Sequence, residues 1–262
     1  MASQVSIFSL ICMGITTIIC LLLPITFLFI WKLKYQLSFK PMCIGAGIYL
    51  IFSFFLESLF TSYILYTPHA LSDYLWEHSL AYALYGCLSA SLFQDIGYFF
   101  AMKKFQSDFP TQSHALFFGI GFGGLEMLFL GFISMWSALS LSFSINSSGL
   151  TSYLETFPDM QSAALSLINS PAYLFLLTGY ERILIFILRL DLSIFIYTAV
   201  SKKKYLFPTA IFLHALFLLP TLLSQRAVFG TGNEITFIIE GVLTIFISFI
   251  TLFTFWVSKK FS

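Results

Sequence analysis

Long apolar stretches separated by short polar segments run through the whole sequence. A membrane-spanning helix needs about 20 consecutive, mostly apolar residues. Seven stretches qualify, namely Val5–Ile30, Met42–Tyr66, Leu80–Met102, Ala115–Phe143, Tyr173–Val200, Leu206–Leu223 and Ile235–Val257. These stretches are uniformly apolar and do not alternate, which favours helices over a closed barrel as the way to pair backbone groups in lipid. The pattern predicts an all-α polytopic bundle of about seven transmembrane helices, in a single domain over residues 1–262.

Basic residues in the polar segments predict how this bundle is oriented. Lys and Arg collect in the cytoplasmic loops of membrane proteins. One predicted side holds Arg226 alone. The opposite side holds ten lysines: Lys32, Lys34, Lys40, Lys103, Lys104, Lys202, Lys203, Lys204, Lys259 and Lys260. The sequence therefore predicts a multi-pass cell-membrane protein with its N-terminus outside and its C-terminus in the cytoplasm.

The longest polar segment runs from about residue 144 to residue 172, on the predicted outer side. It contains four residues typical of turns and helix ends, Asn146, Gly149, Pro158 and Pro171. A short helix at the membrane interface is predicted around Met160–Ile168. The choice between seven and eight helices stays open, because this segment has room for one more short helix.

Composition narrows the function classes. Charged residues make up 10% of the chain and hydrophobic residues 58%, whereas soluble domains carry about 25% charged residues. This excludes a water-soluble globule and makes the lipid bilayer the first predicted partner. The net charge of +1 gives no reason to expect nucleic-acid binding. Four cysteines lie in apolar stretches without metal-ligand spacing, and we interpret them as free thiols: Cys12, Cys20, Cys43 and Cys87.

Three ionisable residues inside the apolar stretches are predicted to lie at similar depth on different helices. Asp95, Glu126 and His214 are each roughly 10–17 Å from the predicted cytoplasmic end of their helix. A charge in lipid costs about 2.5–3.5 kcal/mol, so such groups persist when they are paired, hydrated or functional. Carboxylates with an imidazole are typical of a metal or acid–base site. A buried hydrogen-bonded cluster and an ion or proton path are the alternatives.

Other charges in the stretches have structural interpretations. Glu181 and Arg182 are neighbours in sequence, do not face each other on a helix, and are expected to pair with other helices. Arg189 and Asp191 are interpreted as near enough to the cytoplasmic end to reach the interface. The run Gly119–Gly124 is predicted to let a neighbouring helix approach closely, and it lacks the context of a nucleotide-binding loop.

Several ordered blocks of sequence point to one family. They are Met1–Gln4, Leu37–Lys40, Leu80–Gly86, Gly119–Glu126, Asn169–Phe175, Glu181–Ile183 and His214–Phe217. In these blocks the chain resembles the YhfC-type membrane peptidases, which are relatives of the CAAX-protease and bacteriocin-processing intramembrane metallopeptidases. The resemblance implies a hydrolase of the bacterial plasma membrane that uses zinc.

The first motif that the resemblance implies is Phe-Glu-Glu-Thr-Gly-Arg, in which a glutamate activates water. Here the segment reads Phe93-Gln94-Asp95-Ile96-Gly97-Tyr98. Gln94 therefore replaces the first glutamate, Asp95 shortens the second, and Tyr98 replaces the arginine. A glutamine amide does not act as a general base near neutral pH.

The other two motifs also depart from the family pattern. In Gly-x-Gly-His-Gly-Gly-x-Glu the histidine position holds Phe122, while Glu126 is kept. In His-x-x-x-Asp/Asn, His214 is kept and the acid position holds Leu218. Phenylalanine cannot ligate zinc, and leucine cannot orient a ligand or a water. The family's Glu181–Arg182 pair is retained.

The degenerate motifs lead to three hypotheses. The first is a pseudoenzyme that keeps the metalloprotease scaffold and binds peptides or membrane-protein partners. The second is an active zinc peptidase with a modified site, in which Asp95 and Glu126 are catalytic and His214, Glu126 and Asp95 hold the metal. The third is a small transporter, suggested by the intramembrane acids and arginines but not supported by any inverted repeat.

Overall fold

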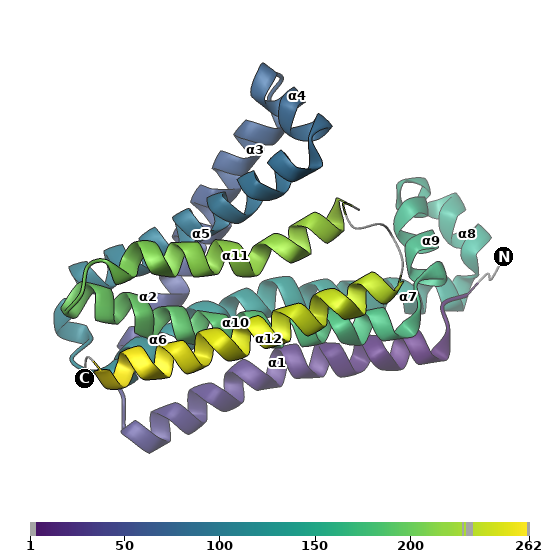
Figure 1. Ribbon diagram of the computed structural model, residues 1–262. Helices are drawn as coiled ribbons and strands as arrows, with labels where there is room; N and C mark the ends of the chain where they lie inside the picture. Colours follow the sequence, from purple (N-terminus) through teal and green to yellow (C-terminus); the bar gives the residue numbers. More distant parts are fainter. Residues whose placement is uncertain (1–3, 227, 229–232, 261–262) are drawn as a thin grey trace. The chain divides into compact units, whose positions relative to one another are not determined.

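The computed structural model describes residues 4–226, 228 and 233–260, and all regular structure in these residues is helical (Figure 1). The elements are α1 (Ile7–Tyr35), α2 (Lys40–Ile48), η1 (Tyr49–Glu57), α3 (Ser58–Tyr66), α4 (Ala70–Glu77), α5 (Ser79–Lys104), η2 (Gln106–Asp108), α6 (Gln112–Glu126), η3 (Met127–Ile133), α7 (Ser134–Ser148), α8 (Leu150–Thr156), η4 (Pro158–Met160), α9 (Gln161–Asn169), α10 (Ala172–Ser201), α11 (Leu206–Gln225) and α12 (Asn233–Lys260). The prediction of an all-α polytopic membrane protein is confirmed.

Within the described residues, six helical segments are long and apolar enough to cross a membrane. They are Ile7–Tyr35, Lys40–Tyr66, Gln112–Ser148, Ala172–Ser201, Leu206–Gln225 and Glu234–Lys260. The seventh predicted stretch forms α5, whose 26 residues give a length of about 39 Å. It is long enough to span, but polar residues such as Gln94 and Asp95 lower its hydropathy. Seven spans therefore remain a prediction that depends on α5.

The chain divides into two compact units, whose boundaries fall inside α1, at the end of α6 and inside α10. The first unit comprises Met1–Thr26 and Glu126–Ile183, and the second comprises Phe27–Leu125 and Leu184–Ser262. In the first unit the side chain of Asn146 bonds both the amide and the carbonyl of Val5, each at 2.8 Å. The short helix α9 of this unit matches the helix predicted around Met160–Ile168.

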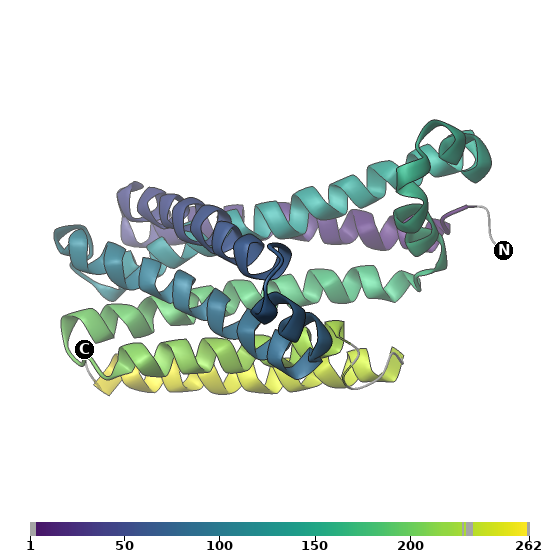
Figure 2. The same ribbon diagram turned by 90° about the horizontal axis from the view of Figure 1, so that it is seen from above.

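Close helix packing in the second unit depends on glycine. A Cβ atom on Gly121 of α6 would collide with the Met42 carbonyl of α2, and one on Gly45 of α2 would collide with the Phe118 carbonyl of α6. The two backbones therefore approach more closely than any larger residue permits. The tight packing predicted for the run Gly119–Gly124 is confirmed. On the other side of the unit, α11 lies against α5 and alongside α12 (Figure 1, Figure 2).

Two segments widen from α-helix to π-helix, and each adjoins an intramembrane glutamate. Glu57 is the last residue of η1, and Glu126 immediately precedes η3. Wide turns of this kind occur frequently at functional sites. In both cases the helix continues on either side, so the widening re-aims side chains without ending the span.

Lysines gather at one end of the second unit. The start of α2 and the ends of α5, α10 and α12 lie at this end (Figure 1). A salt bridge of 2.8 Å between Lys40 and Asp108 and the bond from Ser258 Oγ to Gln112 Oε1 (2.6 Å) join these segments. This arrangement agrees with what the predicted orientation requires, although the orientation itself stays a prediction.

Candidate functional site: a buried carboxylate–histidine–arginine cluster

Asp95 of α5 and His214 of α11 lie in contact in the second unit. The distance from Asp95 Oδ1 to His214 Nδ1 is 3.1 Å, and both side chains are completely buried. The contact exists because α5 and α11 pack along each other and turn these two polar positions toward their common interface. The structure thus brings together two of the three ionisable residues that the sequence suggested would converge.

The third member of the cluster is Arg189 of α10. Its Nη1 lies 2.8 Å from His214 Nε2, and the residue is 2% exposed. A guanidinium has only donors, so Nε2 must accept this bond and the imidazole proton must sit on Nδ1, where it donates to Asp95. Both ring nitrogens of His214 are therefore used in hydrogen bonds within the protein. The formal charges of Asp95 and Arg189 offset each other through the imidazole between them.

The interpretation that Arg189 and Asp191 reach the membrane interface is wrong. Arg189 lies 12 residues before the end of α10 at Ser201, or about 18 Å, which is too far for its side chain to span. It turns inward because His214 accepts its proton. Asp191 is also buried and accepts a bond of 2.6 Å from Thr251 of α12. The depth of Arg189 inside its apolar stretch was the signal that could have identified it.

Aromatic rings fill the space beside this cluster. Tyr98 packs against Phe122 with ring centroids 4.6 Å apart and against Phe118 at 4.9 Å. The guanidinium carbon of Arg189 lies 5.4 Å from the centroid of the Phe122 ring. All three aromatic side chains are completely buried. The position where the resemblance implies a histidine thus belongs to a packed aromatic core, which the Tyr98 ring enters where the family has an arginine.

Gln94 forms a second polar group on α5. Its Nε2 donates to Glu57 Oε2 at 2.8 Å and to Ser53 Oγ at 3.1 Å, both on η1. Where the resemblance implies a catalytic glutamate, the chain therefore has an amide held by another residue's carboxylate. Glu57 had no role in the sequence analysis, although a glutamate in the middle of an apolar stretch is a signal of its own. Leu218 is half-buried one turn after His214 on α11.

The remaining site residues belong to the first unit. Glu126 is 5% exposed at the end of α6. Arg182 Nη2 lies 3.9 Å from Glu181 Oε1. The expectation that these sequence neighbours do not meet is therefore wrong for this atom pair, because two long side chains on adjacent positions can bend toward each other. The participation of Glu126 in a site with Asp95 and His214 stays a prediction.

Comparison with known proteins identifies the family. The model of the YhfC intramembrane metalloprotease family matches residues 19–243. The chain belongs to this family. It is also 32% identical over 246 residues to the uncharacterized membrane protein YhfC of Bacillus subtilis strain 168, covering 92% of each chain. No solved structure matches the chain. The resemblance stated from the sequence is confirmed, and the chain is a multi-pass membrane protein related to intramembrane metalloproteases.

The metal that the YhfC family name implies does not fit the residues that the structure brings together. Neither nitrogen of His214 has a lone pair left for a metal, and the charged Arg189 beside it repels a cation. In the part of the chain that the structure describes, no group of three or more His, Cys, Asp or Glu side chains is placed to hold a metal ion. The four cysteines are free.

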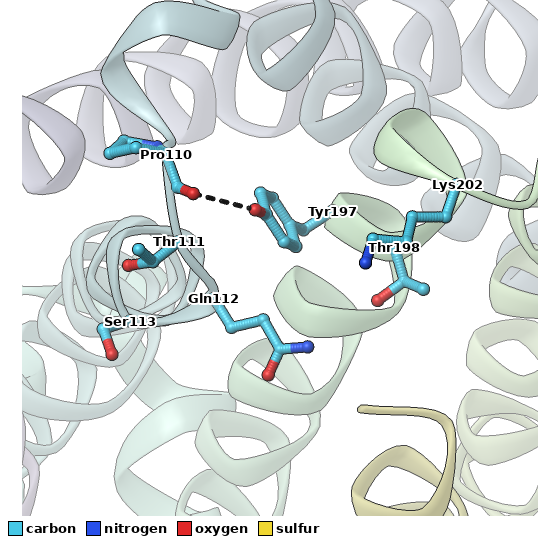
Figure 3. A pocket seen from close by; sticks show the side chains of 7 residues that line it. All are labelled: Pro110, Thr111, Gln112, Ser113, Tyr197, Thr198 and Lys202. Carbon is cyan, nitrogen blue, oxygen red and sulfur yellow. Dashed lines mark hydrogen bonds between the residues drawn. The ribbon is translucent and has the colours of Figure 1, made fainter. Parts of the chain in front are cut away.

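A polar pocket lies elsewhere in the second unit of this YhfC family member, at its lysine-rich end (Figure 3). Its volume is about 450 Å³, and it lies between the start of α6 and the end of α10. The lining residues are Pro110, Thr111, Gln112, Ser113, Tyr197, Thr198 and Lys202. The Tyr197 hydroxyl donates to the Pro110 carbonyl at 3.3 Å. None of the motif residues lines it, and the sequence gave no indication of this pocket.

Proposed function

We propose that this YhfC family member keeps the membrane scaffold of an intramembrane metalloprotease, has lost zinc-dependent peptide hydrolysis, and acts by binding a peptide or a transmembrane segment. The observation that supports the proposal is the 2.8 Å bond between Arg189 Nη1 and His214 Nε2. It engages the imidazole nitrogen that would otherwise be available to a metal.

The chemistry of the neighbouring residues supports the same conclusion. A zinc peptidase needs ligands that hold the metal and a carboxylate that takes a proton from the attacking water. Gln94 offers a neutral amide, and its nitrogen is bonded to Glu57. Phe122 offers an aromatic ring packed against Tyr98. Binding makes no such demand, because it requires only a membrane-embedded surface with suitable shape and hydrogen-bonding groups.

One observation favours an active site with altered ligands as the second candidate. Among the residues that the structure describes, the buried Oδ2 atom of Asp95 has no hydrogen-bond partner. A carboxylate oxygen of this kind beside an imidazole is a possible ligand. This candidate requires Arg189 to leave His214, so it predicts a large rearrangement when zinc is added.

Metal analysis and a cleavage assay distinguish the two candidates. The full chain would be purified without chelator, assayed for zinc by mass spectrometry, and reconstituted with added zinc and a panel of membrane-anchored fluorogenic peptides. We expect far less than one zinc per chain and no cleavage above that of empty vesicles. Cleavage that disappears in both Asp95→Ala and His214→Ala would overturn the proposal in favour of the active enzyme.

A further inference from the structure

A groove of about 370 Å³ runs along α5 on the side of α3, and none of the buried cluster residues lines it. Its lining residues are Phe60 of α3 and Tyr85, Leu88, Ser89, Leu92, Phe93 and Ile96 of α5. Four of them, Phe60, Leu88, Leu92 and Ile96, are exposed. The rings of Phe60 and Phe93 close one side, with centroids 5.2 Å apart. Because both helices coincide with predicted spans, this groove faces the lipid phase.

Two hydroxyl groups in this apolar groove lack hydrogen bonds. Within the described residues, the buried Tyr85 hydroxyl and Ser89 Oγ have no partner, and Ser89 is 7% exposed. On the same helix Ser91 Oγ donates to the Leu88 carbonyl at 3.1 Å. Back-bonding is thus available to a serine on α5, and Ser89 does not use it. Unpaired polar groups are costly in an apolar, water-poor environment, so a ligand that supplies hydrogen bonds gains affinity here.

A carboxylate and an amide oxygen lie near the same groove. Glu57 is half-buried one turn before Phe60 on the same continuous helix, and it accepts from Gln94 on the residue next to Phe93. The Oε1 atom of Gln94 has no partner among the described residues. This side of the groove therefore has hydrogen-bond acceptors and negative charge, which match a ligand that donates hydrogen bonds.

We propose that the groove binds a transmembrane helix of another protein through a hydrogen-bonding side chain of that helix. The proposal rests on the binding role stated above and assigns its location and partner class. A lipid acyl chain fills apolar space but cannot pair hydroxyl groups. A helix has its backbone groups paired internally, so its side chains supply both the apolar contact and the hydrogen bond. A groove of 370 Å³ takes a few side chains of a crossing helix and not a whole chain segment.

The test uses the full chain in proteoliposomes with two synthetic probes. One probe is a leucine-rich transmembrane peptide with a central asparagine, and the other is the same peptide with leucine at that position. Binding is measured by fluorescence energy transfer to the labelled protein. We expect the asparagine peptide to bind about threefold to tenfold more tightly. This advantage should disappear in the double variant Ser89→Ala/Tyr85→Phe and persist in the control Ser91→Ala.

Crosslinking locates the contact. A photoreactive residue at Leu92 should crosslink to the asparagine peptide, whereas one at Ile245, exposed on α12, should crosslink to lipid. Equal binding of the two peptides, an asparagine advantage that survives in the double variant, or lipid crosslinks alone at Leu92 would overturn the groove as a helix site.

Two further readouts separate the possible failures. The double variant should unfold at the same temperature as the wild type or higher, since it removes unpaired hydroxyls. A lower unfolding temperature would show that the hydroxyls stabilise the fold and would overturn the inference. The mass of the recovered peptide is measured in parallel. Cleavage would contradict the proposed loss of hydrolysis, whereas an intact peptide with no asparagine advantage would contradict the groove alone.

Discussion

The two halves of α5 differ in how their polar side chains are used. Near its lysine-rich end, Asp95 bonds His214, which bonds Arg189, and aromatic rings enclose the group. In its other half, Ser89 and Tyr85 have unpaired hydroxyls in a groove rimmed by exposed leucines. The positions where the family motifs reside are thus committed to internal bonds, while positions outside the motifs have hydrogen-bonding capacity to spare.

This contrast separates two uses of a polar group in lipid. A charged group that is fully paired stabilises one arrangement of helices and resists any ligand that must break its bonds. A hydroxyl without a partner contributes little to the fold and is ready to bind a ligand. We therefore expect substitutions in the closed half to change stability strongly and substitutions in the open half to change binding.

The largest effect is expected from Arg189→Leu. Removing one partner of a buried charged network leaves Asp95 uncompensated, and the free energy of unfolding should fall by about 3–5 kcal/mol. Denaturation in detergent micelles measures it. The matched control is Lys204→Leu, which changes an exposed lysine beyond the end of α10 and should leave stability nearly unchanged. An Arg189→Leu protein as stable as the control would mean that the cluster does not hold α10 and α11 together.

A pair of glycine substitutions compares the packing of the two halves directly. In the closed half, a Cβ on Gly97 would lie 2.8 Å from Phe52 Cγ and 2.9 Å from Ile48 Cγ2. In the open half, a Cβ on Gly86 would meet the flexible end of Leu222 at 3.0 Å. We expect Gly97→Ala to cost about 1–3 kcal/mol through overpacking and Gly86→Ala to cost less than 1 kcal/mol, or about half that. Equal losses in the same unfolding assay would remove the distinction.

A double-mutant cycle measures the coupling inside the cluster. Asp95→Asn and Arg189→Leu each leave a charge without its counterpart, whereas the double variant removes both charges. The coupling energy should therefore be favourable, at about 0.5–3 kcal/mol. Additive losses would indicate that the imidazole does not connect the two charges, despite the 2.8 Å and 3.1 Å bonds on either side of it.

The smallest effect is expected from restoring family residues without removing Arg189. Phe122→His/Leu218→Asp supplies two side chains that the motifs imply, yet the guanidinium still occupies His214 Nε2. Zinc content should stay well below one per chain in this variant and rise once Arg189→Leu is added. Circular dichroism serves as the check that each variant stays helical. Stoichiometric zinc in the double variant would contradict the inhibitory role given to Arg189.

Most of the fold was predictable from the sequence because lipid imposes a simple rule. Each of the predicted stretches corresponds to a helix, and the helix at α9 was predicted from turn residues on either side of it. The helical widening at Tyr49–Glu57 was not predictable, because hydropathy does not distinguish a wide turn from an ordinary one. The division into two units depends on contacts between distant segments, which one sequence does not specify.

The candidate site was predictable only in part. Asp95 and His214 stood out because ionisable residues deep in apolar stretches are expensive. Arg189 was missed as their partner because its distance from the end of its helix was underestimated. Glu57 was missed because it has no place in the motifs. The pairing of Gln94 with Glu57 follows from the packing of η1 on α5, which no local pattern encodes.

The wide turns of η1 have a consequence for chain length. A π-helical turn accommodates about one residue more than an α-helical turn over the same rise. Deleting a single residue between Tyr49 and Glu57 would let this segment wind as an ordinary α-helix and rotate everything after it by about 100°. Glu57 would then face away from Gln94 and Phe60 away from Phe93. The span would cross the membrane as before, but its register against α5 would be lost.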